Sequence, residues 1–130
     1  MILSTGLDLC DIRRVEKLFA QHGARFAGKY FTKTERDYAM RQPKPAAALA
    51  RRWAAKEATA KALGTGFRDG LYMHHIEISN DAHGKPHVTL SGRAKTLLDG
   101  LSPAAPSAPR VHLALTDEYP YAMAQVIISV

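Results

Sequence analysis

The chain has 130 residues, enough for one domain with a hydrophobic core and too few for two. Apolar residues make up 46% and charged residues 23%, and no stretch approaches 18 apolar residues, so we expect a globular protein without membrane spans, in the cytoplasm. The net charge of +6 indicates an anionic partner: a nucleic acid, a phosphorylated small molecule, an acidic protein or a membrane surface. Cys10 is the only cysteine, which excludes an intramolecular disulfide.

The first expected element is a strand over residues 2–9, because its side chains alternate between a leucine-rich face and a mixed face. Asp8 lies on the mixed face near the end of this strand. Asp11 is placed to cap a helix over residues 12–21, and Gly23 follows the helix as a stop signal.

The centre of the chain predicts two helices. Thr32 and Glu35 have the spacing of a capping box, which predicts a short helix through residue 40. Prolines then interrupt the chain before a long alanine-rich helix over residues 46–63, and Gly64 is its natural C-terminal glycine.

The last third of the chain predicts mainly strands. The expected elements are a strand over 73–79 that forms a hairpin with 87–90, a helix over 93–99, and strands over 110–116 and 121–128. The fold class is therefore α+β, a single domain over 1–130 with a long helix packed on a mostly antiparallel sheet.

The long helix carries the strongest chemical pattern. Glu57 and Lys61 are four residues apart and share a face, and Lys56 lies beside them in the sequence. A carboxylate and a lysine that project together suit a site for a metal ion and a phosphate, although such a pair is more often a surface ion pair. If the helix packs on the mixed face of the first strand, Asp8 adds a second hard oxygen ligand, as is typical of Mg²⁺ sites.

Two further features point to anionic ligands. The turn Gly64-Thr65-Gly66 directly follows Lys61, and its backbone N–H groups can approach a phosphate, although Gly-x-Gly after a helix is more often a helix cap. A basic strip follows Asp8 in the sequence and suits an acidic docking partner, although a solvated helix face is the usual meaning of such a strip. The strip consists of Arg13, Arg14, Lys17 and Arg25.

Several blocks in this order resemble the short bacterial holo-acyl-carrier-protein synthases, which are 4′-phosphopantetheinyl transferases. The blocks are Gly6-Leu7-Asp8-Leu9 continuing to Glu16, the stretch 53–66, Asn80-Asp81 with Gly84-Lys85-Pro86, and Tyr121-Ala122-x-Ala124-x-Val126. The stretch 53–66, Trp-Ala-Ala-Lys-Glu-Ala-Thr-Ala-Lys-Ala-Leu-Gly-Thr-Gly, is similar to the most specific signature of that family.

The resemblance implies a magnesium-dependent transfer of the 4′-phosphopantetheine arm from coenzyme A to a serine of an apo acyl carrier protein, in fatty acid biosynthesis. Asp8 and Glu57 would hold Mg²⁺ on the pyrophosphate, and Lys61 would contact the phosphates. Adenosine 3′,5′-bisphosphate would leave, and either Glu57 or a water on the metal would take the serine proton. The catalytic residues are thus Asp8, Glu57 and Lys61.

The resemblance also implies binding residues elsewhere in the chain. For coenzyme A these are Arg52, Lys61, Gly64, Thr65, Gly66, Lys85, Pro86 and His112; for the acidic carrier protein they are Arg13, Arg14, Lys17 and Arg25. Many family members have a hydroxyl residue and a second histidine where this chain has Ala114 and Asp117. Members of this length form trimers with active sites shared between protomers, so we expect a homotrimer. We expect it to bind neither nucleic acid nor membranes.

Two other functions compete with this interpretation. A small basic RNA- or nucleotide-binding module without catalysis would bind in a salt-sensitive way and would be indifferent to the loss of Asp8. A structural trimer that binds coenzyme A without transferring anything would leave the coenzyme unconsumed.

Overall fold

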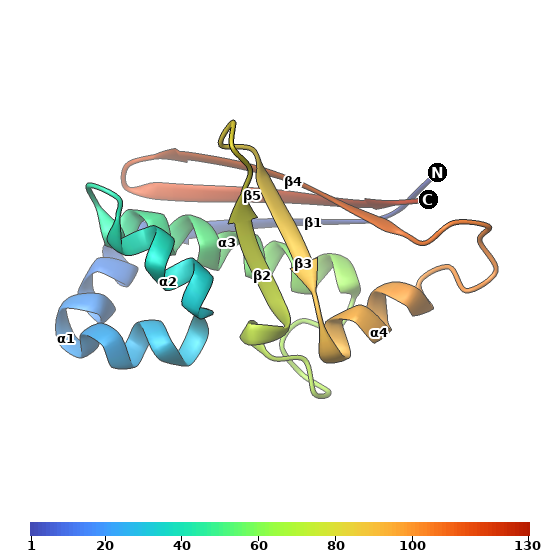
Figure 1. The fold of residues 1–130 in the computed structure, drawn as a ribbon, viewed down its shortest axis with the longest axis horizontal. Coiled ribbons are helices and arrows are strands. Elements are labelled where there is room, and N and C mark those ends of the chain that lie inside the picture. Colours follow the sequence, from blue (N-terminus) through green and yellow to red (C-terminus); the bar gives the residue numbers. More distant parts are fainter.

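The chain folds around one long helix that lies on a three-stranded sheet, in a computed structural model that describes residues 1–130 (Figure 1). The helices are α1 (Ile12–Tyr30), α2 (Lys33–Met40), α3 (Pro45–Leu63) and α4 (Gly92–Gly100), with a 3₁₀ turn, η1 (Met73–His75). The strands are β1 (Ile2–Asp11), β2 (Ile76–Asn80), β3 (Pro86–Leu90), β4 (Arg110–Glu118) and β5 (Tyr121–Ser129). This arrangement confirms the α+β class.

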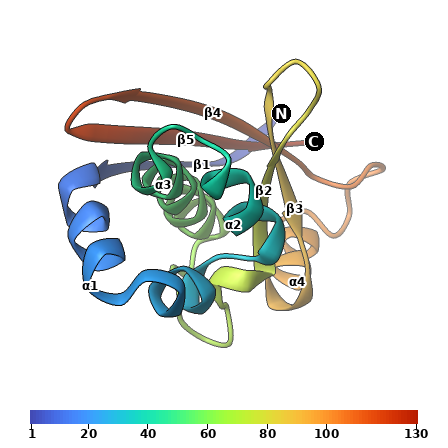
Figure 2. The same cartoon turned by 60° about the vertical axis from the view of Figure 1, so that its left-hand side comes forward.

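All strand pairs are antiparallel and form two sheets. One sheet has the order β1-β5-β4, so the first and last strands of the chain are neighbours, and the other is the β2–β3 hairpin. Figure 2 shows α3 along one face of the larger sheet, with α1, α2 and the hairpin around the rest of this helix. Almost every side of α3 is therefore covered by another element.

Small residues allow α3 to lie very close to β1. A Cβ atom added to Gly6 would be 1.9 Å from the backbone oxygen of Ala58, so only glycine fits at this crossing. Two residues earlier, the hydroxyl of Ser4 donates a hydrogen bond to the Ala62 oxygen at 2.7 Å. The mixed face of β1 is thus the face that packs on α3, as the sequence predicted.

Two predicted boundaries were wrong by more than two residues. The helix predicted to end near Gly23 breaks there (φ 51°, ψ −127°) but resumes and continues to Tyr30, because Phe26 and Ala27 are buried in the core. The strand predicted over 73–79 begins only at Ile76, since Met73–His75 forms the 3₁₀ turn.

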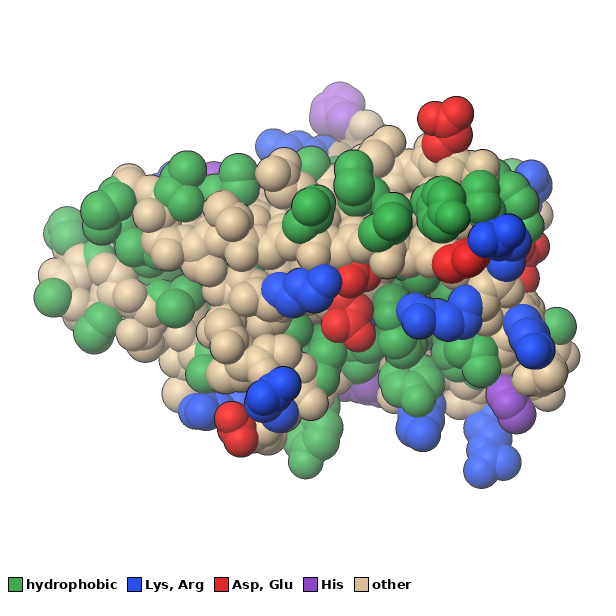
Figure 3. Space-filling view, turned by 180° about the vertical axis from the view of Figure 1, so that it is seen from behind, with side chains coloured by type: hydrophobic (Ala, Val, Ile, Leu, Met, Phe, Trp, Pro, Cys, Tyr) green, Lys and Arg blue, Asp and Glu red, His purple; other side chains and the backbone are tan.

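The face of the larger sheet turned away from α3 is open. Its exposed large side chains are Leu7, Leu9, Tyr121 and Met123. Figure 3 shows hydrophobic side chains in a row along the upper part of the molecule, where the sheet lies in Figure 1.

None of the helices has the length and apolar character needed to cross a bilayer.

Candidate active site at the β1–α3 crossing

The tight crossing of β1 and α3 brings Asp8 to Lys61. Asp8 faces α3 because Gly6 and Cys10, two positions to either side, are buried against this helix. The Lys61 Nζ atom lies 3.0 Å from Asp8 Oδ1 and also donates to the Leu7 oxygen at 3.0 Å. The Asp8 side chain is only 14% exposed and that of Lys61 is 53% exposed, so the pair lies at the rim of the protein interior.

Glu57 lies one turn before Lys61 on the same face of α3. Partial burial raises the pKa of its carboxyl group above the ordinary value, and the negative charge of Asp8 raises this pKa further. The positive charges of Lys61 and Arg14 act in the opposite direction. The two carboxylates are therefore close enough to repel each other, and two basic side chains lie near them.

The donor set fits a magnesium ion. Asp8 and Glu57 offer hard carboxylate oxygens, and no group of three or more His, Cys, Asp or Glu side chains that would complete a protein cage occurs in the chain. Mg²⁺ in proteins is commonly held by one or two carboxylates while phosphates and water supply the other positions. The mutual repulsion that raises the pKa of Glu57 would be relieved by a cation between the carboxylates.

Lys56 does not belong to this site, although it precedes Glu57 in the sequence. Its side chain is completely buried on another side of α3, where Nζ lies 2.8 Å from Glu35 Oε1. Its position next to Glu57 in the sequence does not bring it to the site, because successive helix residues point about 100° apart.

A hollow of about 580 Å³ opens beside Glu57. Its lining comes from the end of α1, from α3 and from the segment before β2: Lys29, Tyr30, Trp53, Glu57, Phe67, Arg68, Asp69, Gly70, Leu71, Tyr72, Met73 and His74. Aromatic side chains and basic groups thus share this cavity with one of the two carboxylates. Lys29 and Tyr30 were not predicted to line a site, because the helix was expected to end before them.

The Gly64-Thr65-Gly66 turn ends α3 next to Lys61. Gly64 has a left-handed conformation (φ 93°), and its N–H group donates to the Lys61 oxygen at 3.0 Å. The Gly66 N–H donates to the Ala60 oxygen at 3.2 Å. The turn is therefore the helix cap that its sequence favoured, and it borders the predicted phosphate site.

The basic strip is exposed along α1, and its members differ in their surroundings. Arg13 is paired with Asp11 at 2.8 Å. The guanidinium carbon of Arg14 lies 5.9 Å from the Trp53 ring centre, whereas Lys17 and Arg25 make no ion pair. In Figure 3, acidic side chains near the middle of the face that is drawn have Lys and Arg side chains on both sides.

Arg25 also lines a second hollow, of about 360 Å³, between the two halves of α1 and α3. Lys29, Tyr30 and Trp53 line both this hollow and the one beside Glu57. The two hollows therefore adjoin each other, and Lys29 connects the basic surface of α1 with the hollow beside Glu57.

His112, another predicted coenzyme ligand, lies at the other edge of the sheet. Asp8 is in line with Ala124 and Leu115 across the sheet, while His112 is three residues further along β4. Two strand spacings alone separate the edges by roughly 10 Å, and His112 points to the open face, away from α3. The His112 ring nitrogen Nε2 lies 2.9 Å from the Ser129 hydroxyl.

Lys85 and Pro86 lie at the turn of the β2–β3 hairpin, whose strand β3 packs beside β4 (Figure 1). Arg52 is almost completely buried: it donates to Asn80 Oδ1 at 2.5 Å, its guanidinium lies 3.8 Å from the Tyr38 ring centre, and its Nε atom has no hydrogen-bond partner. The hairpin turn therefore lies on the β4 side of the molecule, whereas Arg52 is on α3, the helix that also carries Glu57.

The two positions that differ from many relatives are both on β4. Ala114 is exposed on the open face of the sheet. Asp117 forms an ion pair of 3.4 Å with Arg51 on α3, so its charge is partly compensated within the chain.

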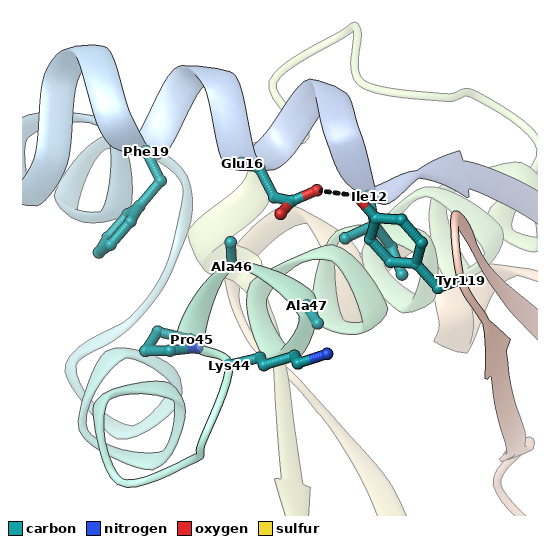
Figure 4. A pocket seen from close by; sticks show the side chains of 8 residues that line it. All are labelled: Ile12, Glu16, Phe19, Lys44, Pro45, Ala46, Ala47 and Tyr119. Atoms are coloured by element: carbon teal, nitrogen blue, oxygen red, sulfur yellow. Dashed lines mark hydrogen bonds between the residues drawn. The ribbon is translucent and has the colours of Figure 1, made fainter.

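A further hollow, of about 450 Å³, lies between α1 and the start of α3 and contains none of the predicted site residues (Figure 4). At one end, the Tyr119 hydroxyl donates to Glu16 Oε1 at 2.7 Å, which joins the β4–β5 turn to α1. This hydrogen bond raises the pKa of Tyr119. Lys44, Pro45, Ala46 and Ala47 line the opposite side.

The sequence of this chain is similar to those of known proteins. The family model of the 4′-phosphopantetheinyl transferase superfamily matches residues 4–124. A holo-[acyl-carrier-protein] synthase of Caulobacter sp. (strain K31) is 46% identical over 98% of this chain and 96% of its own length. A holo-[acyl-carrier-protein] synthase of Beijerinckia indica is 48% identical over 98% of this chain and 91% of its own length.

Solved structures show the same fold. The crystal structure of the holo-[acyl-carrier-protein] synthase from Neisseria meningitidis superimposes with a TM-score of 0.83 at 35% identity and covers 100% of both chains. The Bacillus anthracis enzyme in complex with CoA (3′,5′-ADP) has a TM-score of 0.78 at 30% identity, over 98% of this chain and 96% of its own.

The chain belongs to the 4′-phosphopantetheinyl transferase superfamily and, within it, to the holo-acyl-carrier-protein synthase family. It is accordingly an enzyme, a phosphopantetheinyl transferase. This membership favours the catalytic interpretation over a nucleic-acid-binding module without chemistry.

Proposed function

We propose that the protein transfers the 4′-phosphopantetheine arm of coenzyme A to a serine hydroxyl of an apo acyl carrier protein in the cytoplasm, for fatty acid biosynthesis, and releases adenosine 3′,5′-bisphosphate. The observation that carries the proposal is the convergence of Asp8, Glu57 and Lys61 at the β1–α3 crossing, beside a basic surface. Solved relatives in complex with coenzyme A support this choice of donor.

Each of these side chains has a task in the reaction. Asp8 and Glu57 would hold Mg²⁺, which when bound supplies positive charge to the pyrophosphate oxygens. The Lys61 Nζ atom lies 3.0 Å from Asp8 Oδ1 at the rim of the site. From there the side chain can extend toward a phosphate and neutralise its charge in the transition state. Glu57 has a raised pKa and is therefore suited to accept the serine proton, although a water molecule can also do so.

The basic strip would orient the carrier protein. Arg14, Lys17 and Arg25 are exposed and unpaired, so their charge is free to attract an acidic partner. Such steering raises the association rate and weakens with added salt. The strip leads directly to the hollow beside Glu57, where the acceptor serine has to arrive.

We further propose that the active unit is a homotrimer with shared sites. The separation of His112 and Lys85 from Asp8 within one chain supports this assembly, because a neighbouring copy can supply the second group. The open sheet face, with Leu7, Leu9 and Met123 exposed, offers an apolar surface for such contact.

The transfer is tested by incubating the protein with coenzyme A, Mg²⁺ and an apo acyl carrier protein, and by weighing the carrier with intact mass spectrometry. We expect the carrier to gain one phosphopantetheine unit and expect EDTA to prevent this gain. A competent carrier that stays unmodified while coenzyme A binds would show that the protein binds without transferring.

A further inference from the structure

Lys56 and Glu35 form a completely buried ion pair outside the catalytic group. Both side chains are 0% exposed, and Lys56 Nζ lies 2.8 Å from Glu35 Oε1. Two charges buried in this way lose their hydration, and replacing such a pair with well-packed apolar residues is often neutral or stabilising. Stability alone is therefore a weak reason for charges at this place.

Both members of the pair also hold backbone groups. Lys56 donates to the Met73 oxygen at 2.8 Å and to the Ile76 oxygen at 2.5 Å, so each of its three N–H groups has an acceptor. Glu35 accepts from the N–H group of Thr32 and from that of Ile78, each at 2.8 Å. One ion pair thus joins the start of α2, the η1 turn and β2 to α3.

The backbone held by Lys56 is one wall of the hollow beside Glu57. Leu71, Tyr72, Met73 and His74 line this hollow, and Lys56 makes both hydrogen bonds between α3 and the segment 71–76. Lys56 and Glu57 are neighbours on one helix, so the two hydrogen bonds of Lys56 attach this wall to the helix that carries Glu57.

The basic surface of α1 indicates which substrate meets this wall. The lining of the hollow itself holds the basic Lys29 and Arg68 and the acidic Glu57 and Asp69, and Lys29 also lines the second hollow beside Arg25 on α1. An acidic protein suits this basic surface.

We propose that Lys56, oriented by Glu35, is a positioning residue that fixes the segment 71–76 as a docking wall for the acidic carrier protein beside Glu57. This inference rests on the proposed function. Loss of the pair should loosen the wall and weaken productive docking, while Asp8, Glu57 and Lys61 keep their places on β1 and α3. The Michaelis constant for the carrier should therefore change much more than turnover at saturation.

The test compares the wild type with Lys56→Met and with the double variant Glu35→Gln/Lys56→Gln, which removes both buried charges and so avoids leaving one unpaired. We expect KM for the carrier to rise by about tenfold or more with kcat changed much less, since small misplacements of a docking surface are costly. Hydrogen exchange should accelerate at the amides of residues 73–78, and Mn²⁺ binding, measured by electron paramagnetic resonance, should stay unchanged.

The matched control is Lys33→Met, which removes an exposed pair of 2.6 Å with Asp37 on α2 and should leave every readout unchanged. Unaltered KM and unaltered local exchange in a folded double variant would overturn the proposal and leave the pair a purely structural one. If only the wild-type transfer assay fails, the proposed function fails, while the exchange measurement still decides whether Lys56 fixes the wall.

Discussion

The pKa of the Glu57 carboxyl group is raised in the folded protein because burial and the charge of Asp8 disfavour its ionised form. A carboxyl group whose pKa is higher in the folded than in the unfolded state makes folding less favourable as pH rises from its unfolded pKa through its folded pKa. We therefore expect Glu57→Gln to raise the melting temperature of the metal-free protein at neutral pH, with a gain that disappears at acidic pH. The same variant should lose about a hundredfold or more of its transfer rate.

Thermal melts of both proteins in EDTA measure this gain. They run from about pH 4, close to the ordinary pKa of a carboxyl group, to about pH 8, slightly above neutrality. Glu118→Gln, which neutralises an exposed carboxylate at the end of β4, is the control. A Glu57→Gln variant that is less stable than the wild type at neutral pH would show that Glu57 makes a net favourable contact, contrary to its raised pKa.

At the scale of single residues, the sequence predicted which side chains approach one another on β1 and α3, but not which side chains of α3 are buried. The four-residue spacing of Glu57 and Lys61 and the mixed face of β1 correctly predicted their approach to Asp8. The burial of Lys56 could not be predicted, because α3 is rich in alanine on all sides and no apolar stripe shows which side faces the core. Glu35 was recognised as a helix cap, but its pairing with Lys56 depends on tertiary packing.

The crossing of β1 and α3 is the structural element on which the carboxylate geometry depends. Adding a methyl group at Gly6 would place it 1.9 Å from the Ala58 oxygen, a contact that forces the strand and helix apart. We expect Gly6→Ala to cost about 1–3 kcal/mol in the free energy of unfolding, which is typical of overpacking. Because Asp8 moves with β1, transfer should fall by about a hundredfold even where the variant is fully folded.

Chemical denaturation and the mass-spectrometric transfer assay measure the two effects of Gly6→Ala. Gly28→Ala provides the control, since a methyl group at Gly28 within α1 meets no atom within 4 Å and should stabilise the helix slightly. Full activity in a Gly6→Ala variant would show that the distance between β1 and α3 does not control the site.

Among the helices and strands, local signals predicted the boundaries where a local interaction sets them. The capping box of Thr32 and Glu35 and the C-terminal Gly64 are both observed. The end of α1 could not be predicted from Gly23, because the helix resumes after the break to bury Phe26. The η1 turn was missed for a similar reason: Lys56, distant in sequence, holds its carbonyl group at Met73.

For the whole molecule, the folded chain divides the predicted ligands between two edges of one sheet. Asp8 on β1 faces α3, whereas His112 on β4 faces the open side, and Lys85 lies on the neighbouring hairpin. Asp8 and His112 lie on opposite faces of the sheet, which is the observation that supports the proposed second copy. The sequence could not reveal this division, because it depends on the strand order β1-β5-β4.

The shared site predicts complementation between two inactive variants. Glu57→Gln disables the half at the β1–α3 crossing, and the double variant Lys85→Ala/His112→Ala disables the other half, so each trimer alone should be inactive. In a mixed trimer, a chain with an intact first half meets a neighbour with an intact second half at one of the three interfaces, so about a third of the interfaces are complete. We expect the mixture, co-expressed and purified through two different tags, to recover transfer in that proportion. Light scattering should give three times the chain mass of 14.3 kDa for each sample. Isolated mixed trimers without activity, or an active monomer, would show that each chain holds a complete site.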